Sequence, residues 1–318
     1  MEKITVLTET IPCALAKLIK TILRRGKNIG GEIYTGHPAV TRSLITGLKK
    51  LGAEFNYNPK KIKEVGETVV VLSGVAVLRQ AIKLKRCGKI KKLLAGPNLM
   101  VVSTEFNNIL LVKEIDICLV PSDWVRIAYE EDSPALAGRI KSWPAGVDEN
   151  YWHPDNALPR NKILVYQKNA PEELAKKILE KLKSLNFEAI EIIYNKYKAE
   201  DFKKALSESS LAIFLSLSES QGIALQEAWA MNVPTLCWQP SELTINGRKY
   251  STFSSCPYLS ESTGKSWQTI DELENMLIDY KNTKTLFTPR SWVESNLTDE
   301  LSVHKLLKII NDLDNSKV

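Results

Sequence analysis

The sequence predicts an α/β protein of two doubly wound domains, each with a parallel sheet covered by helices on both faces. Three observations predict this class. Short aliphatic runs alternate with segments of helical periodicity, and this alternation occurs twice along the chain. Trp143-Pro144-Ala145-Gly146 interrupts the alternation between the two series. The length of 318 residues also suits two domains.

The first domain is expected over residues 1–146. Its helices carry aliphatic residues on one face; in the helix at 38–51 these are Val40, Leu44 and Leu48, and Gly52 follows as a stop signal. The predicted strands are 4–8, 33–35, 69–73, 92–95 and 117–121. The predicted helices are 14–25, 38–51, 75–87 and one that Ser122 or Asp123 caps.

The second domain is expected over residues 147–289 and repeats the rhythm. Its predicted strands are 162–166, 189–194, 211–217 and 234–238, and its predicted helices are 171–185, 199–207, 221–231 and 271–280. A further helix is expected at 301–313. The crevice between two such domains is the natural site for a ligand.

Composition excludes several classes of protein. With 44% hydrophobic and 25% charged residues, the chain is neither disordered nor a disulfide-stapled scaffold. No apolar run approaches the ~18 residues of a membrane span, and no secretory signal is visible, so a cytoplasmic protein is expected. Five scattered cysteines without a C-x-x-C pair predict free thiols, and three separated histidines make a metal site unexpected.

Charge is distributed unevenly. Residues 1–100 hold 19 basic and 6 acidic residues, whereas the other 218 hold 24 basic and 31 acidic ones. The simplest interpretation of the densest basic run, 82–94, is a solvated helix face. The alternative is docking on anionic lipid headgroups, to which each basic residue would contribute roughly 1 kcal/mol of binding free energy. No aromatic interleaving, helix-turn-helix or zinc pattern accompanies it, so nucleic acid is not an expected partner.

The most informative stretch is 211–236, an apolar strand, a tight polar turn, a helix and a second strand. Ser220 is placed to cap this helix, which would leave the amides of Gln221, Gly222 and Ile223 unpaired. Gly222 permits a ligand to approach the backbone closely. Unpaired amides and the helix dipole together predict an anion site.

Two carboxylates flank this turn. Glu227 lies seven residues beyond Ser220, or ~10 Å along a helix, roughly the span from a pyrophosphate to the ribose of the same nucleotide. Glu227 could therefore accept ribose hydroxyls, and Glu219 could accept hydroxyls of a sugar beyond the phosphates. Taken without their context, the two residues read as a capping group and a helix-surface charge.

Glu219, Glu227 and the following Asn-Val-Pro at 232–234 resemble the donor-site motif of GT-B glycosyltransferases, especially glycosyltransferase family 4. Residues 120–126 and 143–154 resemble the end of the acceptor domain and the crossover of that family, and 289–310 its terminal helices. The resemblance covers about 115–310, and the first hundred residues by topology only. It implies two Rossmann-like domains facing each other across a cleft, with a C-terminal helix at about 290–318 packing back on the first domain.

The resemblance also implies an activity. It implies a retaining transferase that moves a sugar from a UDP- or GDP-sugar to a glycan or lipid-linked acceptor in polysaccharide biosynthesis, without a metal or other cofactor. Glu227 would hold the ribose, Glu219 the donor sugar, and the amides of 221–223 the pyrophosphate. Attachment to the inner face of a membrane through residues 82–94 would suit such an enzyme.

The cations depart from the family pattern, which has an Arg after the first donor-domain strand and a Lys about five residues later. Here Lys168 fills the first place, but Glu172 and Glu173 stand near the second. Three interpretations stay open: Lys168 acts with Lys196 or Lys198, phosphate binding is weaker, or catalysis is lost. Lys168 could also be a solvated loop lysine.

On the acceptor side, Gly36, His37 and Asn98 are candidates, but the simpler interpretation is a helix cap for His37 and a turn for Gly96-Pro97-Asn98. The alternative functions are a catalytically degenerate nucleotide- or glycan-binding protein of the same fold and a sugar-nucleotide epimerase.

Overall fold

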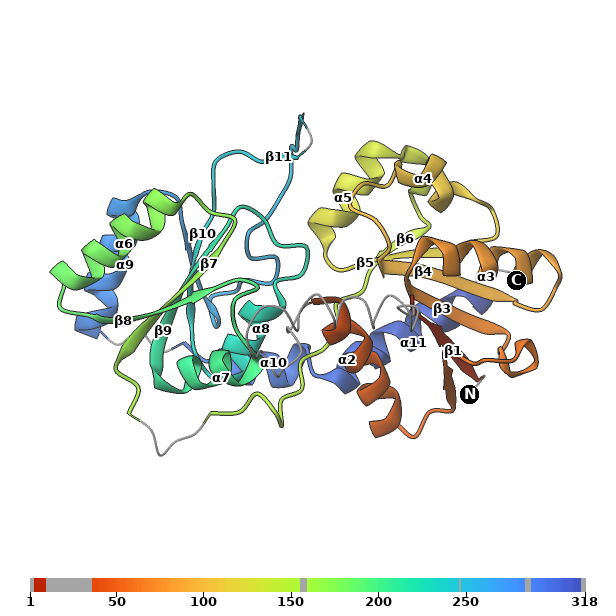
Figure 1. Ribbon diagram of the computed structural model, residues 1–318, viewed down its shortest axis with the longest axis horizontal. Coiled ribbons are helices and arrows are strands. Elements are labelled where there is room, and N and C mark those ends of the chain that lie inside the picture. Colours follow the sequence, from red (N-terminus) through yellow and green to blue (C-terminus); the bar gives the residue numbers. More distant parts are fainter. Residues whose placement is uncertain (1–2, 10–35, 155–158, 246, 284–286, 316–318) are drawn as a thin grey trace, which may run out of the picture.

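The computed structural model describes residues 3–9, 36–154, 159–245, 247–283 and 287–315. Within these ranges the chain forms a six-stranded and a five-stranded sheet, each parallel throughout, and one antiparallel hairpin (Figure 1). The predicted fold class is therefore confirmed. The helix expected at 14–25 and the strand expected at 33–35 lie outside the described residues.

The first sheet has the strand order β2-β1-β3-β4-β5-β6. Its strands are β1 (Ile4–Leu7), β2 (Phe55–Tyr57), β3 (Thr68–Ser73), β4 (Lys92–Asn98), β5 (Ile117–Val120) and β6 (Ile140–Ser142). The four central strands match the sequence prediction. The edge strands β2 and β6 were not predicted, because three residues each are too few to show a strand pattern.

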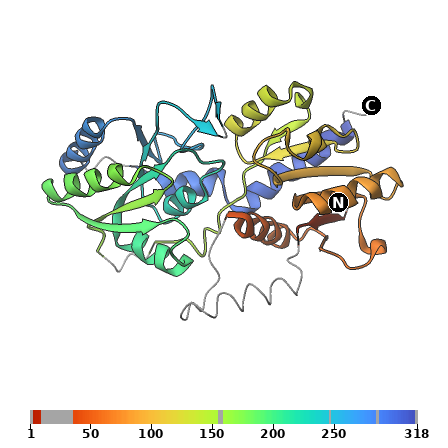
Figure 2. The same cartoon turned by 45° about the horizontal axis from the view of Figure 1, so that its top comes forward.

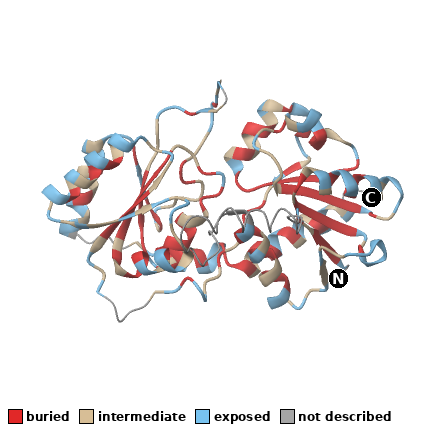
Figure 3. Cartoon of the chain, in the orientation of Figure 1, coloured by how far each residue is buried: buried red, intermediate tan, exposed pale blue. Residues whose placement is uncertain are grey.

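Helices cover both faces of the first sheet. On one face lie α3 (Val75–Arg86) and α5 (Asp123–Asp132), and on the other lie α2 (Gly36–Lys50) and α11 (Asp299–Asn315) (Figure 1). Helix α11 comes from the end of the chain, and its Val303, Leu306 and Ile310 pack with Leu44 and Leu48 of α2. Figure 3 shows that the strands of the first sheet are mostly buried between the helices. The last helix of the chain therefore completes the core of the first sheet. The described part of this domain also contains the short helical segments α4 (Glu105–Asn108), η1 (Ile62–Glu64), η2 (Ile109–Leu111) and η3 (Pro134–Leu136).

The second sheet has the strand order β13-β10-β9-β7-β8. Its strands are β7 (Lys162–Lys168), β8 (Glu188–Ile193), β9 (Ser209–Ser216), β10 (Thr235–Trp238) and β13 (Gly264–Trp267). Helices α6 (Glu172–Ser184) and α9 (Ile270–Thr283) pack on one face. Helices α7 (Ala199–Glu208), α8 (Ile223–Ala230) and α10 (Pro289–Asn296) pack on the other. The sequence pattern predicted all of these except β13 and the separate α10. The helix expected at about 290–318 is divided into α10 and α11, and only α11 packs back on the first domain, whereas α10 packs on the second sheet.

The segment 143–147 joins the two sheets and packs against the start of α11. Trp143 Nε1 donates to the carbonyl of Ser302 at 2.9 Å, and the amide of Gly146 donates to Ser43 Oγ at 2.7 Å. A Cβ on Gly146 would lie 2.5 Å from Cα of Asp299, so only glycine permits this close approach. These contacts hold segment 143–147, the crossover between the domains, against helices α2 and α11.

A hairpin formed by β11 (Thr244–Ile245) and β12 (Arg248–Lys249) leaves the second domain and reaches α5 of the first (Figure 2). Leu243 and Tyr250, at its base, pack with Ala128 of α5. Arg248 forms an ion pair with Asp132. The sequence carries no strand signal here, since two-residue strands have no periodicity.

Within the described ranges, no helix is long and apolar enough to cross a membrane, and no cluster of three or more potential ligands could hold a metal ion. Of the cysteines in these ranges, Cys118, Cys237 and Cys256 are buried and Cys87 is exposed, and all four are free thiols. The prediction of free thiols is confirmed for these four residues.

Candidate functional site

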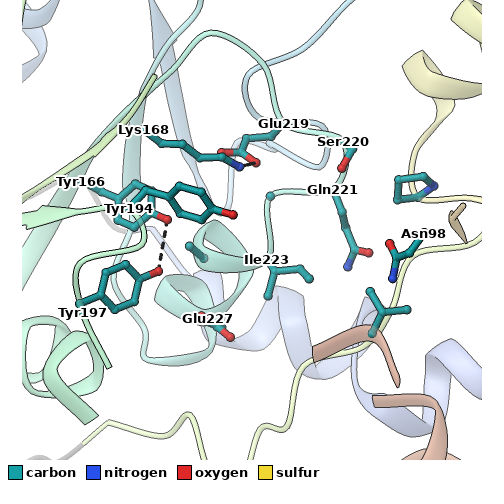
Figure 4. A pocket seen from close by; sticks show the side chains of 14 residues that line it. Asn98, Tyr166, Lys168, Tyr194, Tyr197, Glu219, Ser220, Gln221, Ile223 and Glu227 are labelled. Atoms are coloured by element: carbon teal, nitrogen blue, oxygen red, sulfur yellow. Dashed lines mark hydrogen bonds and ion pairs between the residues drawn. The ribbon is translucent and has the colours of Figure 1, made fainter. Parts of the chain in front are cut away.

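A cavity of about 410 Å³ lies at the carboxyl ends of β7, β8 and β9, facing the first domain (Figure 4). The second domain supplies most of its walls, and the first domain closes it with Val40, Asn98 and Pro121. The remaining lining residues are Tyr166, Lys168, Tyr194, Tyr197, Glu219, Ser220, Gln221, Gly222, Ile223, Ala224 and Glu227. Ligands of open α/β sheets bind at this edge of the strands.

Lys168 and Glu219 form an ion pair at one end of the cavity. Lys168 is the last residue of β7, and its Nζ donates to Glu219 Oε2 at 2.7 Å. Ser216, at the end of β9, donates to the other carboxylate oxygen at 2.8 Å. Lys168 Nζ also lies 4.7 Å from the ring centroid of Tyr194, within range of a cation–π contact. The carboxylate of Glu219 is thus held on both oxygens.

Helix α8 begins next to this pair, two residues later than predicted. Gly222 occupies the N-cap position with φ of 77°, a left-handed conformation that favours glycine, and no side chain caps the helix. The prediction that Ser220 caps α8 is wrong: its side chain is exposed, and the chain needs two more residues to turn into the helix. The first-turn amides, which an α-helix leaves without intrahelical partners, are therefore those of Ile223, Ala224 and Leu225.

Gln221 has a structural role that the sequence did not reveal. Its buried side chain accepts from the amide of Ala145 at 3.1 Å and donates to the carbonyl of Ala145 at 2.8 Å. It also donates to Gln226 Oε1 at 2.8 Å. Gln221 therefore ties the start of α8 to the crossover segment, and its own carbonyl accepts from Gln226 Nε2 at 3.2 Å.

Glu227 lines the cavity one helical turn inside α8 and is 1% exposed. The buried Tyr166 and the partly buried Tyr197 line the same region, and their hydroxyls lie 3.2 Å apart (Figure 4). Burial raises the pKa of both phenols well above the usual range, so both stay protonated and can donate hydrogen bonds at neutral pH. The structure thus brings Glu219, Glu227, Lys168, Ser220 and residues 221–223 around one cavity.

Other predicted residues lie elsewhere. Lys196 and Lys198 are absent from the described lining of the cavity, although Tyr194 and Tyr197 of the same loop belong to it. Asn98 ends β4 and does line the cavity. Gly36 and His37 are the first residues of α2, so His37 does not precede the helix as expected. The side chain of His37 lies outside the described part of the structure.

Several lining or supporting residues were missed. Tyr194 and Tyr197 follow the carboxyl end of β8. Because ligands of open α/β sheets bind at the carboxyl ends of strands, this position could have indicated both residues. Trp124 of the first domain donates from Nε1 to the backbone carbonyl of Glu219 at 2.8 Å, and the amide of Glu219 donates to the carbonyl of Ser254 at 2.9 Å. These long-range contacts have no local sequence signal.

The basic run 82–94 is largely paired with acidic residues. Lys85 contacts Asp116, Arg86 lies 2.8 Å from Glu114, and Lys91 lies 2.8 Å from Glu67. Lys92 lies 2.6 Å from Asp314 of α11. These acids compensate much of the local charge, and membrane attachment through this run stays a prediction.

No family model matches the chain, and no curated protein matches its sequence. Solved structures do match its fold. The lipopolysaccharide outer core galactosyltransferase WaaB in its apo form aligns over 99% of this chain and 100% of its own, with a TM-score of 0.56 and 11% identity. A sucrose-phosphate synthase from Thermosynechococcus elongatus aligns over the same shares, with a TM-score of 0.54 and 12% identity.

The catalytic domain of starch synthase IV from Arabidopsis thaliana, bound to ADP and acarbose, aligns over 96% of this chain and 98% of its own, with a TM-score of 0.52 and 11% identity. The two sheets and these alignments give the chain the fold of GT-B glycosyltransferases. The resemblance read from the sequence motifs is confirmed at the level of the fold.

Proposed function

We propose that the protein transfers a sugar from a UDP- or GDP-sugar to an acceptor hydroxyl with retention at the anomeric carbon. One observation carries this proposal: the Lys168–Glu219 pair, the start of α8 and Glu227 border a single cavity at the carboxyl edge of the second sheet. The fold matches, including galactosyltransferase and synthase structures, support the same class of reaction.

The chain offers a partner for each part of such a donor. The diphosphate would lie against the first-turn amides of α8, where the helix dipole favours negative charge. The ribose hydroxyls would meet Glu227, with the phenols of Tyr166 and Tyr197 as neighbouring donors. The transferred sugar would lie beside Glu219, which is held in place by Ser216 and Lys168.

In the reaction, the bond between the anomeric carbon and the diphosphate oxygen breaks, and a bond to the acceptor oxygen forms. The proton of the acceptor hydroxyl leaves with the nucleoside diphosphate. Negative charge builds up on that leaving group, and fixed cations and dipoles lower the barrier most when they face it. Lys168 and the start of α8 supply this stabilisation.

The weakest part of the site is its positive charge. Among the lining residues that the structure describes, Lys168 is the single cation, and its charge is balanced by Glu219. Glu172 and Glu173, near the expected second cation, lie exposed in the first turn of α6. This observation favours a second candidate function, a nucleotide- or glycan-binding protein that has lost catalysis.

A thermal-shift screen of UDP- and GDP-sugars, followed by a measurement of nucleoside diphosphate release, separates these functions. A transferase is stabilised by its donor and releases diphosphate faster when acceptor is added. A binding protein is stabilised without release. An epimerase changes the sugar while it remains bonded to the diphosphate. Absence of stabilisation by every nucleotide-sugar would refute the transferase, the epimerase and a nucleotide-binding role.

A further inference from the structure

A second cavity of about 460 Å³ adjoins the first on the side of the first domain. The two share Asn98, Pro121 and Ser220, so one molecule can extend from one cavity into the other. Three elements form the walls of the second cavity. The loop after β4 contributes Val101 and Phe106, helix α5 contributes Trp124 and Tyr129, and the hairpin side contributes Ile245 and Tyr250.

The walls are mostly apolar, although the side chains of Glu105 and Ser218 also line the cavity. Several of the other polar groups are bonded within the protein. Trp124 Nε1 donates to the carbonyl of Glu219 at 2.8 Å, and the hydroxyl of Tyr129 donates to the carbonyl of Met100 at 2.7 Å. Asp132 is paired with Arg248 of the hairpin. A free sugar placed along the apolar walls would lose water from its hydroxyls and find few hydrogen-bond partners there, which is costly.

Apolar surface continues beyond the mouth of this cavity. Val101 is 65% exposed and Phe106 is 47% exposed, although both are large apolar side chains. Phe106 is held at φ of 55°, and Asn107 and Asn108 follow at 60° and 56°. Three consecutive residues in the left-handed region make a tight turn that keeps Phe106 at the rim.

We infer that the second cavity binds the hydrocarbon portion of a lipid-linked acceptor. This inference rests on the proposed transferase function. The acceptor hydroxyl would lie at the polar junction near Asn98 and Ser220, next to the donor cavity. The hydrocarbon chain would run along α5 and leave the protein between Val101 and Phe106. The amphiphilic shape of the site thus selects a lipid-linked acceptor over a free glycan.

Alkyl β-D-glucosides with hexyl, octyl and decyl chains probe this site directly. Their dissociation constants are measured by calorimetry, below the concentrations at which they form micelles and without any nucleotide. Each added methylene that enters the cavity raises affinity about three- to fourfold. In the exposed-rim variants Val101→Asp and Phe106→Asp, decyl glucoside binds at least tenfold more weakly. Ile62→Asp is the matched control, because Ile62 is also 65% exposed and does not line the cavity.

Affinity that is independent of chain length would overturn the inference, and so would equal losses in the rim variants and the control. Because no nucleotide is present, this result is separate from the test of the donor site. A protein that binds UDP or GDP but shows no preference for longer chains retains the proposed function and loses the lipid-linked acceptor. A protein that shows the chain-length dependence but binds no nucleotide loses the transferase function, and with it the role of the cavity as an acceptor site.

Discussion

Lys168 Nζ lies 2.7 Å from Glu219 Oε2, although the two residues are 51 positions apart in the sequence. The pair links the carboxyl ends of β7 and β9. The parallel register that places Lys168 opposite Ser216 brings the two side chains together. In this arrangement the single cation of the described cavity lining is neutralised by the carboxylate next to it. An anionic donor must therefore compete with Glu219 for Lys168.

Lys168→Met is expected to reduce turnover by about 10²–10³-fold, because it removes the cation that faces the leaving diphosphate. The Michaelis constant for the donor should change much less, since the first-turn amides of α8 remain. Steady-state kinetics with the matched control Lys196→Met, an exposed lysine outside the described cavity lining, provide the test. Turnover equal to that of the control would remove Lys168 from the mechanism.

Glu219→Gln is expected to have opposite effects on binding and on turnover. Loss of the carboxylate charge frees Lys168, so UDP or GDP should bind several-fold more tightly. Transfer should fall about 100-fold, because the transferred sugar loses its charged acceptor. Calorimetry and kinetics on the same preparation measure both quantities, with the exposed Glu261→Gln as control. Weaker nucleotide binding in Glu219→Gln would show that the pair does not restrain Lys168.

Trp124→Phe is expected to lower turnover several-fold while the donor affinity stays near that of the unmodified protein. The substitution keeps an aromatic ring but removes the hydrogen bond to the carbonyl of Glu219, which is worth about 1 kcal/mol. Trp124 thus acts as a positioning residue that links the first domain to Glu219. Trp238→Phe is the control, and equal turnover in the two variants would argue against this role.

Asp299→Asn is expected to stabilise the protein above pH 6. Burial raises the pKa of Asp299 to about 6, so the folded protein holds a proton there that the unfolded chain releases near pH 4. The free energy of unfolding therefore falls as the pH rises from about 4 to 6. In Asp299→Asn this fall should be smaller, so its free energy of unfolding at pH 8 should exceed that of the unmodified protein by on the order of 2 kcal/mol.

Denaturant unfolding at several pH values measures this effect. Asp312→Asn, on the exposed face of the same helix, is the control. If the Asp299→Asn variant is less stable than this control at pH 8, the raised pKa is contradicted.

The sequence was sufficient for the parts of the fold that depend on local periodicity. Helix α2 and strands β3 and β9 carry long apolar patterns, and each was found within two residues of its bounds. The motif around Glu219 and Glu227 was also sufficient to indicate the family of folds. Both signals lie within short windows of sequence.

The rest depends on contacts between distant segments. The hydrogen bond of Trp124 to Glu219 spans 95 residues, and the hairpin contacts α5 over a similar separation. The cap of α8 was misassigned because Ser220 is the better capping residue by type, whereas the turn requires the left-handed Gly222. In that turn, the backbone conformation that the chain needs, and not the capping preference of the side chain, determines which residue is the N-cap.

The central claim is that the cavity beside α8 binds a nucleoside diphosphate with its ribose on Glu227. Calorimetric titration of UDP and GDP into the unmodified protein, Glu227→Gln and the exposed control Glu172→Gln tests it most directly. We predict that either UDP or GDP binds the unmodified protein and the control with equal affinity. The same nucleotide should bind Glu227→Gln at least tenfold more weakly, while this variant keeps the thermal midpoint of the unmodified protein. Equal affinity in all three proteins, or no binding to any of them, would contradict the claim.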